Sequence, residues 1–137
     1  MSDPSRAQLR HLVYDRANGI CEYCRTSEAN TGQTMQVDHI DPQGGDSPDN
    51  LCLACMNCNA SKHKATTALD PITQANVPLY NPRIQVWSEH FEWINDATLV
   101  HGLTPTGRAT VARLRVNRPM MISARQRWVE LRHHPPD

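Results

Sequence analysis

Apolar residues recur at helical spacing near the start of the chain, between Ser5 and Gly19. Ser is a favourable N-cap and Gly a favourable residue just after a helix, so we expect a helix over about residues 5–18. The segment 34–40 then alternates weakly between polar and apolar positions and leads into the turn-forming residues 42–45. This change of period predicts a short strand after the first helix.

A second helix is expected from Cys55 to Leu69. Asp70-Pro71 follows it, and the residue before a proline disfavours helical geometry. Residues 71–82 have no clear period, so we interpret them as an irregular connection that wraps the body of the protein.

Large apolar side chains return at Trp87, Phe91 and Trp93, just ahead of Asn95-Asp96. Asn and Asp favour tight turns, so we expect a hairpin whose return strand covers residues 98–103. The chain has few other large apolar groups. The aromatic residues are therefore expected to pack in the core rather than to stack on nucleic-acid bases.

Two helices are expected to close the chain. Thr104 is a good cap for a helix that runs to about Val116, and Arg118-Pro119 separates it from a last helix that ends near His133. The histidines outside the central segment, among them His134, are expected at the surface or at helix ends.

Length and composition predict one domain over residues 1–137, because 137 residues with 39% apolar content fit one compact core or a small core with an elaboration. The expected mixture of helices and strands indicates the α+β class. No run approaches the ~18 apolar residues that a membrane span needs. The first residues also lack the apolar stretch of a secretion signal. We therefore expect a soluble, cytoplasmic protein with no membrane partner.

Charge is unevenly distributed although the formal net charge is zero. From residue 100 onward the chain has seven arginines against two acidic residues. Arginine presents a planar fork of donors that suits phosphates, so this third of the chain is a candidate surface for a polyanion. The alternative is that these arginines are solvated or pair with acidic residues of the first part. The seven are Arg108, Arg113, Arg115, Arg118, Arg125, Arg127 and Arg132.

Four of the five cysteines form two Cys-x-x-Cys pairs, at Cys21/Cys24 and Cys55/Cys58. Each pair lets two sulfurs converge from one tight turn, and four thiolates complete a closed tetrahedral shell around a structural Zn²⁺. A redox dithiol and plain buried cysteines are the alternatives. The fifth, Cys52, is expected to be a small core residue because four sulfurs already satisfy the metal.

The residues between and after the cysteine pairs supply chemistry that a zinc clamp does not need. They are Asp38, His39, Asn50, Asn59, Lys62 and His63. If the strand packs on the second helix, Asp38 can meet Asn59 and His63, which are one helical turn apart. A carboxylate, an amide oxygen and an imidazole would bind a divalent ion loosely.

His39 can take a proton from water, since imidazole titrates near neutral pH. Adjacent side chains of a strand point to opposite faces, so Asp38 and His39 would need a strand end or a bulge to share one site. Lys62 is expected either to contact a phosphate or to be solvated on an exposed helix face.

The order of these residues resembles the HNH endonuclease family in its zinc-clamped form. The resemblance covers about residues 17–64 and rests on Cys-x-x-Cys, Val-Asp-His-Ile-x-Pro with Gly-Gly after it, Asn-Leu, and Cys-x-x-Cys-Asn-x-x-Lys. The remainder of the chain is similar to an extension seen in small stand-alone bacterial members. This resemblance implies a zinc-bound, treble-clef-like ββα finger at residues 17–69, with residues 70–137 as a C-terminal elaboration that is Arg-rich from 108.

The resemblance also implies roles for individual residues. His39 matches the general base that activates water for attack on a phosphodiester. Asp38 and Asn59 match the ligands of a catalytic divalent ion, for which the Asn favours Mg²⁺ or Mn²⁺ over zinc. Asn50 matches the residue that holds the loop and orients the histidine, and His63 matches a further metal or phosphate contact.

The function implied is therefore a metal-dependent endonuclease that hydrolyses DNA to products with 5′ phosphate and 3′ hydroxyl ends. Lys62, Arg108, Arg113 and Arg115 are the candidate substrate-binding residues. The alternative is a non-catalytic zinc-stabilised module that binds nucleic acid or protein, in which Asp38 and His39 are structural. A mere zinc module needs only the cysteines, whereas this chain also has the polar residues of the family motif.

Overall fold

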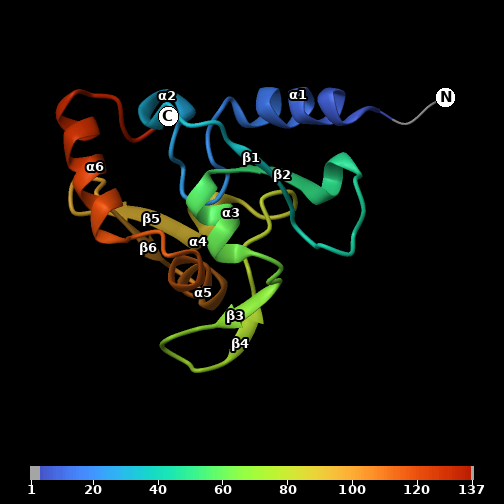
Figure 1. The fold of residues 1–137 in the computed structure, drawn as a ribbon. Helices are drawn as coiled ribbons and strands as arrows, with labels where there is room; N and C mark the ends of the chain where they lie inside the picture. The colour runs from blue at the N-terminus through green and yellow to red at the C-terminus, as the bar shows by residue number, and fades with distance from the viewer. Residues whose placement is uncertain (1–3, 137) are drawn as a thin grey trace.

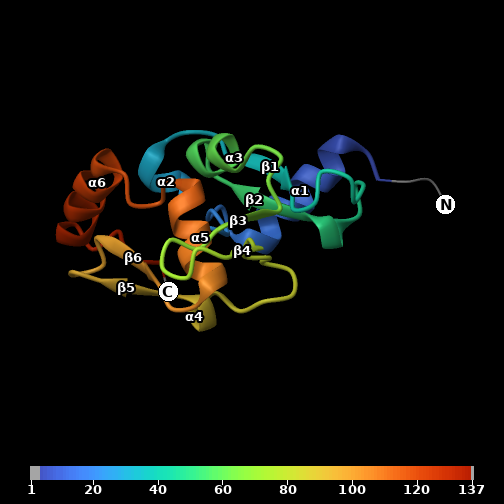
Figure 2. The same ribbon diagram turned by 90° about the horizontal axis from the view of Figure 1, so that it is seen from below.

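The structure of the protein, a computed structural model, describes residues 4–136 and is of mixed α+β class, as predicted. Helices α1 (Arg6–Ala17) and α6 (Pro119–Glu130) lie at opposite ends of the molecule in both ribbon views (Figures 1 and 2). Helices α3 (Met56–Lys62) and α5 (Pro105–Leu114) lie between them and contact each other. Among the residues described, no helix has the length and apolarity needed to cross a membrane.

Helix α1 begins and ends as the sequence predicts. The Ser5 hydroxyl accepts a hydrogen bond from the Gln8 backbone N–H at 3.1 Å, and the Gln8 side chain accepts one from the Ser5 N–H at 2.7 Å. This reciprocal capping box satisfies two donors that the helix leaves unpaired. Asn18 ends the helix in the left-handed conformation with φ 56°. Val13 is its fully buried residue.

A ββα unit follows, made of the hairpin β1 (Gln36–His39) and β2 (Leu51–Ala54) and of α3. The two strands are antiparallel, and their register sets Asp38 opposite Cys52. All four residues of β2 are buried. A strand that is buried on both faces has no polar alternation, which is why the bounds of β2 could not be predicted from the sequence.

Two short elements on either side of β1 were also not predicted, namely α2 (Glu28–Thr31) and the 3-10 turn η1 (Pro48–Asn50). Each begins at a serine whose hydroxyl accepts a backbone N–H, Ser27 for α2 and Ser47 for η1. Elements of three or four residues are too short for a periodic signal, and only these caps could have indicated them.

The prediction of a helix to Leu69 is wrong, because α3 ends at Lys62. His63 has a positive φ of 52°, outside the helical region. The chain then forms the hairpin β3 (Thr67–Leu69) and β4 (Asn76–Pro78), of which β3 lies in the segment expected to be helical and β4 in the one expected to be irregular. Both strands contact α5, so tertiary packing stabilises a hairpin that its own sequence does not signal.

The C-terminal half contains the predicted hairpin, now seen as β5 (Phe91–Ile94) and β6 (Leu99–Gly102). A single turn, α4 (Trp87–His90), precedes it, and α5 and α6 follow it as expected. Thr104 caps α5, since its hydroxyl accepts the Gly107 N–H at 3.0 Å. Helix α6 ends at Glu130, three residues before the predicted end.

The aromatic residues of this half pack on one another, as predicted. Trp87 and Phe91 are buried, and their ring centroids are 5.1 Å apart. The Trp87 indole N–H donates to the Tyr23 carbonyl at 2.8 Å, which ties the aromatic cluster to the first Cys-x-x-Cys turn. Trp93 stacks edge-on against His134 at 4.5 Å.

His134 was expected at the surface, but its side chain is buried. The last residues return to the body of the protein, where the Asn30 side chain of α2 donates to the His133 carbonyl at 3.0 Å. The position of a terminal segment depends on what it packs against, and no local pattern in residues 131–136 encodes that contact.

Candidate active site and metal centre

The four cysteines of the two Cys-x-x-Cys pairs form one buried cluster, with all sulfur atoms within 4.8 Å of one another. The backbone N–H of Cys24 points to the Cys21 sulfur at 3.5 Å, and that of Cys58 points to the Cys55 sulfur at 3.4 Å. Four convergent sulfurs in a closed, buried shell are the ligand set of a structural zinc site. The cluster therefore supports the zinc prediction over a single redox dithiol.

Cys52 lies outside this cluster, as predicted. It is fully buried, and its thiol contacts the Tyr23 hydroxyl at 3.3 Å. Burial raises the pKa of Cys52 well above its usual range, and the nearby Asp38 carboxylate raises it further. Cys52 therefore stays a neutral thiol that packs in the core.

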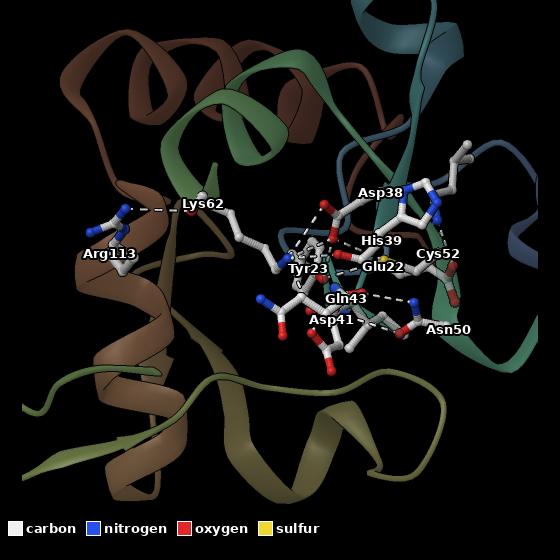
Figure 3. Close-up of polar contacts among 12 residues, drawn as sticks. Glu22, Tyr23, Asp38, His39, Asp41, Gln43, Asn50, Cys52, Lys62 and Arg113 are labelled. Atoms are coloured by element: carbon white, nitrogen blue, oxygen red, sulfur yellow. Dashed lines mark hydrogen bonds and ion pairs between the residues drawn. The ribbon is translucent and has the colours of Figure 1, made fainter. Parts of the chain in front are cut away.

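Strand β1 keeps a regular pleat through Asp38 and His39, so their side chains leave on opposite faces. Neither a bulge nor a break brings the two side chains together. Asp38 points toward α3, and the His39 ring is turned away from it (Figure 3). Strand β1 does end at His39, but its pairing stays regular to that residue, so the strand end does not bring the two side chains onto one face.

The Asp38 carboxylate is only 4% exposed, and protein groups surround it. The Tyr23 hydroxyl donates to Asp38 Oδ2 at 2.7 Å, and the Lys62 ammonium lies 3.1 Å from the same oxygen. Burial raises the pKa of Tyr23, and the charge of Asp38 raises it further, so the phenol keeps its proton and acts as a donor. Asp38 thus joins the first Cys-x-x-Cys turn, β1 and α3.

Lys62 is the least expected member of this network. Its side chain is 1% exposed, and its ammonium donates to the carbonyl oxygens of His39 and Ile40 at 3.0 and 3.2 Å as well as contacting Asp38. This burial contradicts one of the two alternatives drawn from the sequence, the solvated helix face, whereas the phosphate contact stays a prediction.

His39 instead faces a surface pocket of about 300 Å³. Its side chain is 42% exposed, and its Nε2 lies 2.7 Å from Asp46 Oδ1. Arg6 and Arg10 of α1 line the same pocket. Asp46 and these two arginines were not singled out from the sequence, since they are near His39 only through folding and belong to no motif.

Asn50 fastens the loop that leads from β1 to β2. Its side-chain oxygen accepts the Asp41 N–H at 2.9 Å, and its amide nitrogen donates to the carbonyls of Asp41 and Gly45 at 2.8 and 2.9 Å (Figure 3). A side chain at Gly44 would collide with this amide, because its Cβ would lie 2.7 Å from Asn50 Nδ2. The same loop carries Asp46, the partner of His39.

Asn59 and His63 were paired in the sequence analysis because they are four residues apart. Asn59 is half-buried on α3, three residues before Lys62, and therefore lies on the helix face that meets β1. His63 is exposed and follows the end of the helix with a non-helical backbone. The helical reason for placing His63 beside Asn59 is therefore wrong, and its role in metal binding stays a prediction.

The arginines predicted to bind substrate make contacts within the protein. Arg108 forms a bidentate pair with Asp70, both bonds being 2.9 Å, and this guanidinium holds the pKa of Asp70 well below its usual range. Arg113 donates to the carbonyls of Ser61 and Lys62 at the end of α3. The alternative that these arginines pair with the first part of the chain is thus correct for Arg108.

Two more arginines of this region also have structural positions. Arg115 ends α5 in the left-handed conformation with φ 53°, and its side chain is exposed. Arg125 is fully buried and donates to the carbonyls of Thr98 and Val116. The surface of this region therefore carries fewer positive charges than its amino-acid composition suggests.

Comparison with known proteins gives one match. Residues 21–65 match the model of the HNH endonuclease family, over about a third of the chain. The matched segment contains the four cysteines of the cluster and every polar residue of the predicted motif. The resemblance found in the sequence is confirmed for this segment. No curated protein and no solved structure matches the chain.

Proposed function

We propose that this chain, whose residues 21–65 carry the HNH endonuclease domain, hydrolyses phosphodiester bonds in DNA. The observation that carries the proposal is the His39 imidazole. It lies in an open pocket, is hydrogen-bonded to Asp46, and has two arginines beside it. A histidine with a purely structural role would not require an open pocket, a carboxylate partner and two neighbouring arginines.

His39 is proposed as the general base. A base must have one ring nitrogen available to water while the other is held in place. The carboxylate of Asp46 contacts Nε2 of His39, which leaves Nδ1 for a water molecule. Deprotonation of that water at Nδ1 would generate the nucleophile that attacks phosphorus.

Arg6 and Arg10 are proposed to bind a phosphate of the nucleic acid. Both line the His39 pocket from α1, and a guanidinium is suited to bidentate contact with phosphate oxygens. Arg10 also donates to the Met35 carbonyl at 3.1 Å, so part of its donor set is already fixed in position. The exposed Arg115 is a further candidate on α5.

Asp38 and Asn59 are proposed to hold the catalytic divalent ion, with His63 as a candidate third ligand. Oxygen atoms of Asp38, His39 and Ile40 already surround one cation, the Lys62 ammonium. Carboxylate, carbonyl and amide oxygens are ligands that Mg²⁺ and Mn²⁺ prefer, so the donor set fits such an ion. When bound, the ion would neutralise charge that develops on the phosphate.

A phosphodiester that contacts both His39 and the divalent ion at Asp38 would lie across the end of β1. His39 is the last residue of this strand, and Asp38 and His39 leave it on opposite sides. Asn50 would keep the adjoining loop in place through its three hydrogen bonds, and with it Asp46.

One observation favours the non-catalytic alternative. Asp38 is buried and its charge is matched by Lys62, as expected of a purely structural ion pair. In that case the protein would bind nucleic acid through its arginines and would not cleave it.

The test uses purified, zinc-loaded wild-type protein and the His39→Ala variant with supercoiled plasmid, in Mg²⁺, Mn²⁺ or EDTA. The wild type is expected to cut in the presence of a divalent ion and not in EDTA, whereas the variant binds plasmid but does not cut. If both proteins bind DNA and RNA and neither cuts in any metal, the binding-module alternative replaces the nuclease.

A further inference from the structure

We propose that the Lys62 ammonium occupies the cation position beside Asp38 and that a divalent ion binds there only by displacing it. This inference rests on the proposed function, because it concerns the ion that the nuclease would use. It gives Lys62 a role that differs from both expectations drawn from the sequence.

The geometry around Lys62 is that of a filled cation site. An ammonium has three N–H donors, and here three protein groups accept them, namely Asp38 and the carbonyls of His39 and Ile40. The ammonium has contacts of 3.0 to 3.2 Å to each group and is buried. The site is therefore complete in the absence of any metal.

A metal ion bound to Asp38 would compete with the ammonium for the same oxygens. Lys62 Nζ contacts both carboxylate oxygens of Asp38, at 3.1 and 3.4 Å, so a metal ion on either oxygen would lie against the ammonium. Two positive charges at such a separation repel strongly in a buried environment. Binding of the metal to Asp38 therefore requires the ammonium to leave.

The structure offers a place for the displaced ammonium. Lys62 borders a pocket of about 610 Å³, and Asp41 and Gln43 line it. Lys62 is the last residue of α3, and its side chain is four flexible carbons long. The ammonium can thus exchange Asp38 for Asp41 without unfolding of the helix.

Displacement has a measurable consequence for metal affinity. The metal must compete with a resident cation, so the apparent dissociation constant equals the intrinsic one divided by the fraction of molecules in which Asp38 is not paired with Lys62. In a Lys62→Met variant the competitor is absent, and we expect Mn²⁺ to bind about tenfold more tightly. The same contact would keep Asp38 neutralised until an ion arrives.

The test uses the labelling of lysines in the wild-type, zinc-loaded protein. The chain has only two lysines, Lys62 and Lys64, and Lys64 is exposed. Acetylation of the native protein followed by peptide mass spectrometry should modify Lys64 at once and leave Lys62 protected. Addition of Mn²⁺ should increase labelling of Lys62 about fivefold or more and leave Lys64 unchanged as the internal control.

Mn²⁺ binding is measured in parallel by electron paramagnetic resonance, with Asp38→Asn as the variant that removes the ligand. If Mn²⁺ binds in an Asp38-dependent manner while Lys62 stays protected, the displacement inference is overturned and the proposed metal site survives. If neither the wild type nor Lys62→Met binds Mn²⁺ through Asp38, the metal site of the proposed function fails as well. Should Lys62→Met not fold, the wild-type labelling experiment still decides.

Discussion

At the scale of single residues, strand β1 separates the polar groups of the motif into a buried side and an open side. Asp38 faces Tyr23 and Lys62 in the interior, whereas His39 faces Asp46 in a surface pocket. Burial strengthens the electrostatic contacts of the first group and exposure leaves the second accessible to water. The two neighbours in sequence are therefore suited to different tasks.

Asn50 connects these groups through the loop that carries Asp46, and its removal should reduce activity. We expect Asn50→Ala to lose at least about tenfold in single-turnover cleavage and roughly 1–2 kcal/mol in the free energy of unfolding, since three hydrogen bonds are lost. Asn76→Ala is the matched control, because Asn76 donates to Thr67 in the distant β3–β4 hairpin. Equal cleavage rates for the two variants would contradict the role given to Asn50.

The four-cysteine cluster could be predicted from the sequence, but the faces and partners of Asp38 and His39 could not. The spacing of Cys21, Cys24, Cys55 and Cys58 is enough to predict the zinc cluster, because each pair converges locally. The partner of Asp38 depends on how α3 packs on β1, and that of His39 on a loop contact. Contacts between residues far apart in the chain produce no local pattern in the sequence.

At the scale of elements, helices α1, α5 and α6 and the β5–β6 hairpin follow from caps and periodicity, whereas α2, α4, β2, β3 and β4 do not. Thr104 and Ser5 give clear cap signals for α5 and α1. Strand β2 does not alternate between polar and apolar residues, because it is buried throughout. Strands β3 and β4 have three residues each and pack against α5. Elements that depend on tertiary contacts are those that local propensity misses.

The close approach of α5 to the end of α4 depends on a missing side chain at Gly107. A Cβ on Gly107 would lie 2.0 Å from the His90 carbonyl oxygen, a backbone atom that cannot easily move. We expect Gly107→Ala to lower the free energy of unfolding by about 1–3 kcal/mol, as overpacking does. Ala112→Ser on the exposed face of the same helix is the control. Urea unfolding measures both, and equal midpoints would contradict the close contact.

The buried His134 should make stability depend on pH. Burial lowers its pKa from the usual value near 6.5, so the unfolded chain takes up the proton first as pH falls. The neutral, buried His134 therefore stabilises the fold at pH values above about 6.5, and this contribution is lost as pH falls below that value. We expect the melting temperature of His134→Gln to depend less on pH between 7.5 and 5.5 than that of the wild type. His11→Gln, at an exposed position, should keep the wild-type slope.

At the scale of the whole molecule, the four-cysteine cluster joins the turn at residues 21–24 to the end of β2 and the start of α3. Its sulfurs come from Cys21 and Cys24 in one turn and from Cys55 and Cys58 at the start of α3. Metal binding at such a site becomes folding free energy, because the unfolded chain has no preformed cluster. A core this small gains much from one metal crosslink.

Loss of one sulfur should therefore unfold the protein, whereas loss of the fifth cysteine should not. We expect Cys58→Ser to lose zinc and native circular dichroism at 37 °C, and Cys52→Ala to keep one zinc per chain with a modest loss of stability, roughly 1–2 kcal/mol. Zinc content by mass spectrometry and thermal melts provide the measurement. Retention of zinc by Cys58→Ser would exclude the four-cysteine site.

The central claim is that His39 activates the water that attacks the phosphodiester. The most direct test compares single-turnover cleavage of a DNA duplex by zinc-loaded His39→Ala and His101→Ala. His101 is the matched control, because it is also a surface histidine paired with a carboxylate, Glu92, at 2.8 Å. We expect His39→Ala to lose about 10²-fold or more in rate, and His101→Ala to keep the wild-type rate. Equal rates for the two variants would contradict the assignment of His39 as the general base.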